Sequence, residues 1–197
     1  MKRLNTEIRQ KQIIESALSI IKEKGLSRLT IKNLSNAVQL SEQAIYRHFE
    51  NKLAILKALI AYFNQSLHEK LNERPPTSDI LQDIEQIIIC HLEFFASKPE
   101  MASLVYTEEV FHAEPLISAK IQETIDKRMV TIAGIIKQAQ QEGLVKQELD
   151  SGNLALMIFG TIRIVITNWR FSGFSFDLVS KGQSLAKDLI YLIQTKN

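Results

Sequence analysis

Apolar residues recur every three or four positions along most of this chain. In residues 6–24 they stand at positions 13, 14, 17, 18 and 21, a spacing typical of an amphipathic helix that buries one face. The same spacing predicts further helices over residues 31–38, 41–48, 52–71, 78–97, 116–142 and 151–170, shorter pieces between 99 and 115, and a last helix over about 176–194.

The ends of these segments carry residues that begin and end helices. Predicted N-caps are Thr30, Ser41, Asn51 and either Asp150 or Ser151, while Gly25, Gly143 and the Pro75–Pro76 pair end helices. The chain holds only 7 Gly and 4 Pro, and neither an internal repeat nor a credible run of strands is visible. The sequence therefore predicts an all-α fold of about nine helices.

Composition narrows the class of protein. At 197 residues, with 45% hydrophobic and 23% charged residues, the chain has the make-up of an ordinary globular protein of one large or two modest domains. The single cysteine, Cys90, excludes an internal disulfide and a cysteine-based zinc site, and fits a reducing cytoplasm. The apolar stretch 154–169 is interrupted by Gly160, Arg163 and Asn168, so we expect a buried helix there and no membrane span.

Charge is distributed unevenly along the chain. Residues 1–52 carry a net charge of +5, whereas residues 53–197 carry −3. A basic segment on a mildly acidic body indicates that only the N-terminal part meets a polyanion. A solvated basic face without a partner would give the same charges.

Two short helices, 31–38 and 41–48, joined by a tight turn form the pattern of a helix-turn-helix, whose second helix enters the major groove of DNA. The second helix buries Ala44, Ile45 and Phe49. Its outward side chains can form hydrogen bonds with base edges and phosphates: Glu42, Gln43, Tyr46, Arg47 and His48.

Residues 9–59 resemble the N-terminal domain of the TetR/AcrR family of bacterial repressors. The matching positions are Arg9, Ile13, Ala17, Leu18, Gly25, Thr30, Ile31, Leu34, Ala37, Ile45, Tyr46, His48, Phe49, Asn51, Lys52 and Leu56. The chain departs from the family at Gln39–Leu40, where Gly-Val is usual, and at Ser35–Asn36, where Ala is common. A left-handed turn at Gln39 would cost free energy. The resemblance implies a DNA-binding domain over residues 1–52, a linking helix over 52–72, and an effector-binding and dimerisation domain over 53–197.

The resemblance also implies a role for each outward residue of the DNA-binding domain. Base readout falls to Gln43 and Arg47, with Glu42 and Ala44 adding cytosine or thymine-methyl contacts. Phosphate contacts fall to Thr30, Ser41, Tyr46, His48 and Lys52, with Lys2 and Arg3 as a flexible arm. Two alternatives stay open: His48 packs helix 41–48 onto the next helix, and Ala44 is only a spacer.

Helix 151–170 is apolar nearly all round, which is unusual for a surface helix of a monomer. The resemblance implies a homodimer in which helices at about 153–171 and 176–194 pair with their twins as a four-helix bundle, each subunit reading one half-site of double-stranded operator DNA. The predicted interface anchors are Phe159, Ile162, Ile166, Trp169, Leu185, Leu189 and Leu192. The alternative is that helix 151–170 is only the buried centre of the body.

The fourth to seventh helices usually enclose an effector pocket in this family. The candidate lining residues are Phe63, Cys90, Phe94, Phe95, Tyr106, Met129 and Ile132. The alternative for each is plain core, which is what apolar residues at helical spacing usually form. No basic residues cluster among them, which predicts a mostly apolar ligand. The implied mechanism is repression relieved when the ligand changes the spacing of the two heads.

The sequence gives little support for an enzyme. Cys90 and His91 are adjacent on a predicted helix and point about 100° apart, so they do not form a nucleophile–base pair. Glu108 and His112 are spaced as two metal ligands on a helix would be, but two ligands are a weak signal beside a solvated polar patch. We therefore predict no enzyme activity, cofactor or metal, and a regulator in the cytoplasm, associated with the nucleoid. The rival function is a DNA-binding adaptor that acts through protein partners.

Overall fold

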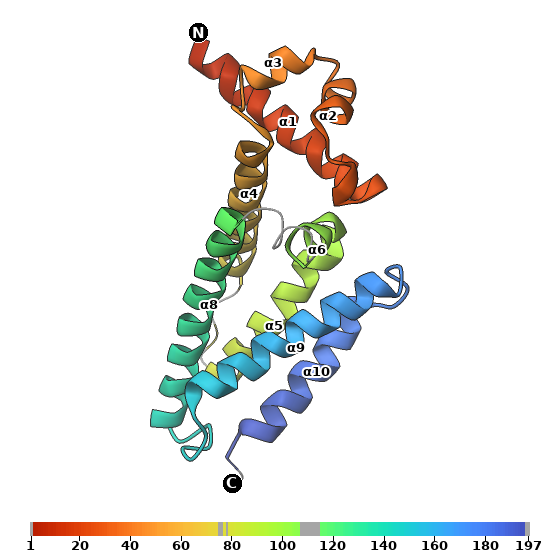
Figure 1. Ribbon diagram of the computed structural model, residues 1–197. Coiled ribbons are helices and arrows are strands. Elements are labelled where there is room, and N and C mark those ends of the chain that lie inside the picture. The colour runs from red at the N-terminus through yellow and green to blue at the C-terminus, as the bar shows by residue number, and fades with distance from the viewer. Residues whose placement is uncertain (1, 75–76, 78, 107–114, 196–197) are drawn as a thin grey trace. The chain divides into compact units, whose positions relative to one another are not determined.

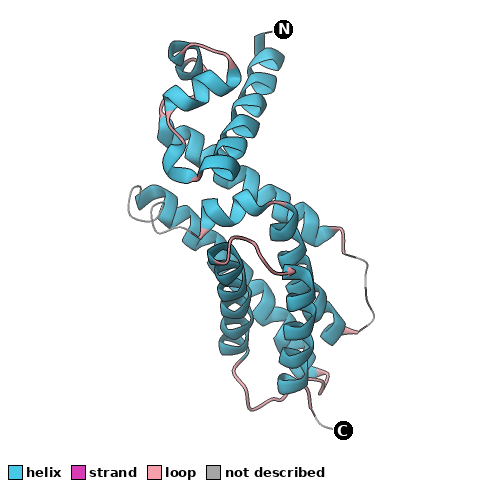
Figure 2. Cartoon of the chain, turned by 90° about the vertical axis from the view of Figure 1, so that its right-hand side faces the viewer, coloured by secondary structure: helices cyan, strands magenta, loops and turns pink. Residues whose placement is uncertain are grey.

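The computed structural model describes residues 2–74, 77, 79–106 and 115–195, with side chains from residue 6 onward. Within these residues it contains nine α-helices, one short 3₁₀ helix and no strand. Figure 1 labels these α-helices, and Figure 2 colours the helices cyan. This confirms the predicted all-α class. The chain forms two compact units, which we name the head unit (Met1–Gln65 with Pro99–Ile121) and the body unit (Ser66–Lys98 with Gln122–Asn197).

The head unit is built around its first helix. It contains α1 (Lys2–Lys24), η1 (Leu26–Arg28), α2 (Ile31–Val38), α3 (Glu42–Tyr46), α6 (Pro99–Val105) and the first parts of α4 (Lys52–Asn72) and α8 (Pro115–Gln141). Helix α1 packs against both α2 and α6. The core is formed by apolar side chains that are almost fully buried, among them Ile13, Ile21, Leu29, Leu34 and Ile45.

The two compact units group some segments differently from the predicted domains, whose boundary at residue 52 stays a prediction. Helix α6 and residues 52–65 of α4 belong to the head unit. The physical reason is that α6 covers part of α1. Helical periodicity shows that a short helix buries one face, but it does not show which neighbour covers that face.

Local hydrogen bonds fix the ends of the short helices in the head unit. The Thr30 hydroxyl oxygen accepts from the Asn33 backbone N–H at 3.1 Å, and the Ser41 hydroxyl oxygen accepts from the Ala44 backbone N–H at 3.1 Å. Asn51 Oδ1 accepts in the same way from the N–H of residue 54 at 2.9 Å, at the start of α4. These bonds confirm the three caps predicted from residue type.

The turn between α2 and α3 contains a left-handed residue in spite of its departure from the family's Gly-Val. Gln39 has φ 56° and ψ 44°, and its position ends α2. The N–H of Leu40 donates to the Ser35 carbonyl at 3.0 Å, which closes the end of the helix. A glutamine side chain in this region of backbone space is strained, since the left-handed helical conformation brings Cβ too close to the following carbonyl oxygen.

In the body unit, α5 (Ile80–Ser97), α9 (Ser151–Phe171) and α10 (Leu178–Ile193) pack against one another, with the end of α4 and most of α8. The contact of α5 with α10 depends on Gly182, because a Cβ atom there would overlap the buried side chain of Leu92. Helix α5 begins two residues later than the predicted start at 78. Its N-cap is Asp79, whose Oδ1 accepts from the Leu81 N–H at 2.9 Å.

Helix α9 is long and apolar enough, by length and composition, to cross a membrane. In the body unit, however, it packs against α5 and α10. The side of α9 that includes Ile158, Ile162 and Ile166 is buried in these contacts. This arrangement is that of a core helix, in agreement with the sequence prediction.

Candidate functional site

Helix α3 presents a polar surface on a firmly anchored scaffold. Ile45 is fully buried and Phe49 is 8% exposed, so the apolar side of the segment is held in the core of the head unit. Glu42, Gln43 and Arg47 are exposed, and Tyr46 is 47% exposed. Four of the five side chains predicted to face outward are therefore free of the core and carry hydrogen-bonding groups that can reach DNA.

His48 and Ala44 are the two residues of this segment with open alternatives. His48 is half-buried, and its Nδ1 is shielded from solvent without a hydrogen-bond partner in the described part of the chain. Its carbonyl oxygen accepts from Gln10 Nε2 of α1 at 2.9 Å. Ala44 is half-buried and donates its N–H to Ser41. Both residues therefore contribute to the structure of the head. Because Nδ1 of His48 is shielded, only the other ring nitrogen, Nε2, is left to contact a phosphate.

The remaining phosphate candidates lie at helix N-termini. Thr30 and Ser41 are exposed, and each already accepts a backbone hydrogen bond as an N-cap. The hydroxyl hydrogen of an N-cap serine or threonine can still be donated to a phosphate oxygen. Lys52 is exposed at the first residue of α4, where the free backbone N–H groups also favour an anion. The side chains of Lys2 and Arg3 lie outside the described residues.

A cavity of about 240 Å³ lies within the body unit, between the end of α4, α5 and α8. Its lining combines apolar and polar side chains: Leu71, Ile87, Ile132 and Ile135 on one hand, and His68, Asn72, Arg74, His91, Arg128 and Thr131 on the other. Of the seven predicted pocket residues, only Ile132 is in this lining. Sequence reasoning missed the two arginines because Arg128 belongs to α8 and Arg74 follows the end of α4, 54 positions away in the sequence.

His91 is the most unusual residue of the cavity wall. It is 2% exposed, and its Nδ1 lies 2.8 Å from the carbonyl oxygen of Ile87, one turn earlier in α5. Burial lowers the pKa of His91 to about 4, with the positive charges of Arg128 and Arg74 acting in the same direction. The imidazole is therefore neutral at physiological pH.

The other predicted pocket residues lie elsewhere. Cys90, Phe94 and Phe95 are buried on α5, and the two phenylalanine rings meet edge to face at a centroid distance of 5.3 Å. Burial raises the pKa of the Cys90 thiol. Phe63 and Tyr106 belong to the head unit, and Met129 is half-buried on α8. Their role as pocket residues stays a prediction.

The predicted interface anchors on α9 occupy the inner side of the helix. Phe159, Ile162, Ile166 and Trp169 are all less than 8% exposed within their own chain, because this side faces the core of the body unit. The outer side of α9 instead exposes other apolar residues: Leu156, Met157, Ile164 and Phe171. On α10, Leu185 and Leu189 are half-buried and Leu192 is 60% exposed. A helix that is apolar on all sides gave no means of telling the two faces apart.

Two family profiles match the chain and overlap near its fourth helix. Residues 13–59 match the profile of bacterial regulatory proteins of the tetR family. Residues 50–192 match the TetR profile described as YsiA-like protein, C-terminal region. This chain belongs to the TetR family. It is therefore a DNA-binding transcriptional regulator and not an enzyme.

Three relatives show the range of proteins that this TetR-family chain is similar to. A probable acrEF/envCD operon repressor of Escherichia coli is 25% identical over 188 residues, which cover 92% of this chain and 84% of that protein. The crystal structure of the transcriptional regulator FadR from Bacillus subtilis in complex with stearoyl-CoA has a TM-score of 0.75 and 26% identity, covering 91% of this chain and 97% of that one. The nucleoid occlusion factor SlmA of a Marinomonas species is 25% identical over 138 residues, covering 69% of this chain and 70% of that protein.

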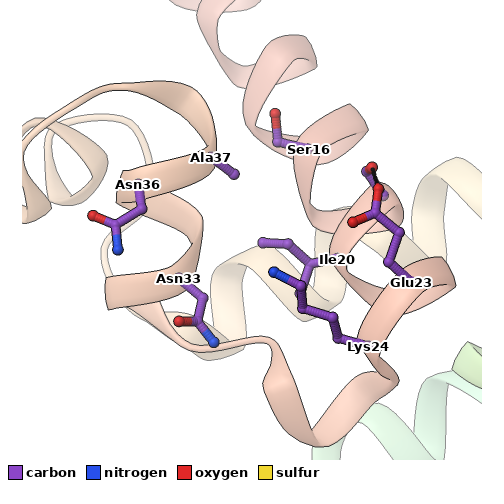
Figure 3. A pocket seen from close by; sticks show the side chains of 8 residues that line it. Ser16, Ile20, Glu23, Lys24, Asn33, Asn36 and Ala37 are labelled. Carbon is purple, nitrogen blue, oxygen red and sulfur yellow. Dashed lines mark hydrogen bonds between the residues drawn. The ribbon is translucent and has the colours of Figure 1, made fainter.

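A second hollow of the TetR-type head lies between α1 and α2. This groove, of about 430 Å³, is lined mainly by polar side chains, including Ser16, Glu23, Lys24, Asn33 and Asn36 (Figure 3). It contains none of the predicted DNA contacts. Because its lining is mainly polar and belongs to α1 and α2, we interpret it as a solvated surface groove.

The described residues form no metal site. Among them, no three His, Cys, Asp or Glu side chains come together as metal ligands would. Glu108 and His112, which the sequence analysis considered as a weak candidate pair of metal ligands, lie outside the described residues.

Proposed function

We propose that this TetR-family regulator is a homodimeric repressor that reads two operator half-sites with α3 and leaves the DNA when a small ligand binds its body unit. The proposed DNA binding rests mainly on one observation, the polar and exposed face of α3. This helix is held in place by the buried side chain of Ile45 and by the Ser41 cap at its N-terminus. A recognition helix requires this combination of fixed backbone and free side chains.

Within the head, base readout and positioning fall to different side chains. Gln43 and Arg47 are exposed and lie one helical turn apart, and arginine to guanine is the commonest specific contact in the major groove. Glu42 is exposed beside them, and Ala44 is half-buried. Thr30, Ser41, Tyr46, His48 and Lys52 position the head on phosphates, with Lys2 and Arg3 as the arm.

Dimerisation is proposed on the outer side of α9. Leu156, Met157 and Ile164 are each more than half exposed, and Gly160 between them leaves the helix surface open, since a Cβ there would meet nothing within 4 Å. The opposite side of the helix is buried in the body unit. A row of solvent-exposed apolar side chains on such a helix is typical of an oligomer interface. The exposed Leu192 and the half-buried Leu185 and Leu189 of α10 extend this apolar surface.

Ligand binding is proposed at the cavity between α4, α5 and α8. The comparison with FadR in complex with stearoyl-CoA supports a ligand with an apolar chain, and Leu71, Ile87 and Ile132 supply an apolar wall. Helix α4 connects the two functions, because it runs unbroken from Lys52 at the proposed phosphate contact to Leu71 in the cavity wall. A ligand that prefers one conformation of this helix shifts the dimer away from the DNA-bound state.

The similarity to SlmA supports a second candidate function, a DNA-bound adaptor in the nucleoid that acts through protein partners. The two candidates differ in what releases the protein from DNA. A small molecule releases a ligand-responsive repressor, whereas an adaptor stays on DNA and recruits its partner there.

The dimer proposal is tested by light scattering after size exclusion. The wild type is expected at twice the chain mass of 22.5 kDa. Leu156→Glu combined with Ile164→Glu places two charges on the outer side of α9 and is expected to give a monomer with weak operator binding. Val130→Glu is the matched control, because Val130 is also an exposed apolar residue, on α8. A dimeric double variant would contradict the proposed interface.

A further inference from the structure

Gln10 of α1 forms a direct hydrogen bond with the segment that follows α3. Its side-chain Nε2 donates to the carbonyl oxygen of His48 at 2.9 Å, and the two residues lie 38 positions apart in the sequence. Both residues are half-buried in the head unit. The bond therefore ties the first helix of the head to the end of the proposed recognition helix.

The other hydrogen bonds at the end of α3 are local to this segment. The helix has only five residues, Glu42–Tyr46, and a helix of this length is not stable by itself. The N–H of Arg47 donates to the Gln43 carbonyl at 3.2 Å. The N–H groups of His48 and Phe49 both donate to the Ile45 carbonyl, at 2.9 and 3.0 Å. These bonds maintain the shape of the segment, but they do not fix its orientation relative to α1.

The carbonyl oxygen of His48 depends on Gln10 for its donor. Within the described part of the chain, no backbone N–H donates to this oxygen. A partly buried carbonyl without a donor is unfavourable, so loss of the Gln10 amide favours a shift of the His48 peptide. Because His48 follows Arg47 directly, such a shift also changes the direction of the Arg47 side chain. Readout of a base edge by paired hydrogen bonds tolerates only small displacements.

We propose that Gln10 is a positioning residue for operator recognition, whose side-chain amide holds the end of α3 so that Arg47 meets its base pair. The proposal deepens the proposed function and rests on it, since it requires that Arg47 reads a base. The sequence analysis assigned no role to Gln10, because the residue acts through a bond to a distant segment. The competing possibility is that Gln10 stabilises the head without affecting which sequences it binds, and the experiment separates the two.

The test measures two affinities of the full-length protein by fluorescence anisotropy. One probe is a DNA duplex that the wild type selects from a random-sequence library, and the other is a scrambled duplex of the same composition. Gln10→Met keeps the length and the helix propensity of the side chain but has no donor. It is expected to bind the selected duplex roughly fivefold to tenfold more weakly, as for one lost hydrogen bond. Its affinity for the scrambled duplex is expected to stay unchanged, because that affinity depends on phosphates.

Gln12 supplies the matched controls. It is an exposed glutamine of the same helix, and its Oε1 accepts from Arg9 Nη1 at 2.9 Å instead of bonding to the α3 segment. Gln12→Met is expected to keep both affinities of the wild type. Gln10→Lys restores a donor and is expected to restore the ratio of the two affinities, with Gln12→Lys as the control for its added charge.

Gln10→Glu is a second variant for the loss of the donor, so that the test does not depend on the folding of Gln10→Met. It keeps the shape of the side chain but places a second acceptor beside the His48 carbonyl, and it is expected to lower the same ratio. Gln12→Glu controls for its charge. Thermal denaturation of every variant checks that it is folded at the temperature of the binding assay.

A double-mutant cycle shows whether Gln10 acts through Arg47. If it does, Gln10→Met lowers the affinity of an Arg47→Ala protein for the selected duplex by less than about twofold, since residues of one unit are not additive. In a Lys52→Ala protein it is expected to have its full effect, because that phosphate contact is independent of Arg47. The full effect in both proteins overturns the proposal, as does an equal loss on the selected and scrambled duplexes.

The proposed function fails by other outcomes of the same measurements. A wild type that selects no duplex contradicts operator recognition, and an Arg47→Ala protein that keeps the wild-type ratio contradicts readout by Arg47. When both of these results support readout, a Gln10→Met protein with the wild-type ratio contradicts the positioning role alone.

Discussion

The imidazole of His91 is bonded to the backbone of its own helix, with Nδ1 2.8 Å from the carbonyl oxygen of Ile87. This bond fixes the ring as the neutral tautomer with its proton on Nδ1. The opposite nitrogen, Nε2, is buried and has no hydrogen-bond partner in the described part of the chain. One hydrogen bond within α5 thus fixes the tautomer of His91, and burial of the ring lowers its pKa.

The free energy of unfolding is expected to fall as the pH decreases from about 6.5 to about 4. The pKa of His91 is lowered from its ordinary value of 6.5 to about 4 in the folded chain, so between these values the unfolded chain binds a proton that the folded chain does not. Acid therefore favours unfolding, by about 3 kcal/mol once the pH reaches 4. Urea denaturation at pH 7.5, 6, 5 and 4.5 measures this loss, and His91→Leu isolates it. A stability difference between the two proteins that does not change with pH would contradict the assignment.

Arg47→Ala and Lys52→Ala are expected to weaken DNA binding in different ways. Loss of an arginine that reads a base costs roughly 1–3 kcal/mol on the specific site and relaxes the preference at one base pair of each half-site. Loss of a lysine at a phosphate weakens binding to all sequences alike and flattens the dependence of affinity on salt. Electrophoretic shift assays on an operator and on scrambled DNA at several salt concentrations separate the two, with the exposed Lys57→Ala as a control. Equal losses of specificity would contradict these roles.

Ser41→Asp is expected to separate the cap of α3 from its phosphate contact. An aspartate still accepts from the Ala44 N–H and suits the positive end of the helix, so the free energy of unfolding is expected to stay near that of the wild type. Its negative charge repels a phosphate, so DNA binding is expected to fall. Ser41→Ala removes the cap and is expected to cost about 1 kcal/mol of stability. If Ser41→Asp binds DNA like the wild type, Ser41 does not contact a phosphate.

Gln39→Gly is expected to stabilise the head by about 0.5–1 kcal/mol. The residue has φ 56°, and glycine adopts this conformation without the steric cost that glutamine bears, a gain partly offset by the greater freedom of glycine in the unfolded chain. Lys32→Gly, in the exposed interior of α2, is the matched control and is expected to lose about 1 kcal/mol. Thermal denaturation of both variants measures the contrast. A loss at both positions would show that the strain at Gln39 is negligible.

The sequence determined the local structure of this protein. The caps at Thr30, Ser41 and Asn51 and the buried Ile45 could all be predicted, because each depends on neighbouring backbone groups or on a clear periodicity. These features are concentrated in the head, and they explain why the amino-acid sequence by itself is enough to recognise the family and to propose which helix reads DNA.

Only the tertiary structure decided the faces and the cavity of the body unit. Helix α9 is apolar on all sides, so its periodicity did not show that Phe159 packs inward and Leu156 faces out. That choice depends on where α5 and α10 lie. The cavity likewise unites Arg74, His91 and Arg128 from three separate segments, and no local pattern brings such residues together. Packing between distant segments buries His91 and gives this cavity a partly polar wall, whereas the mostly apolar effector pocket stays a prediction.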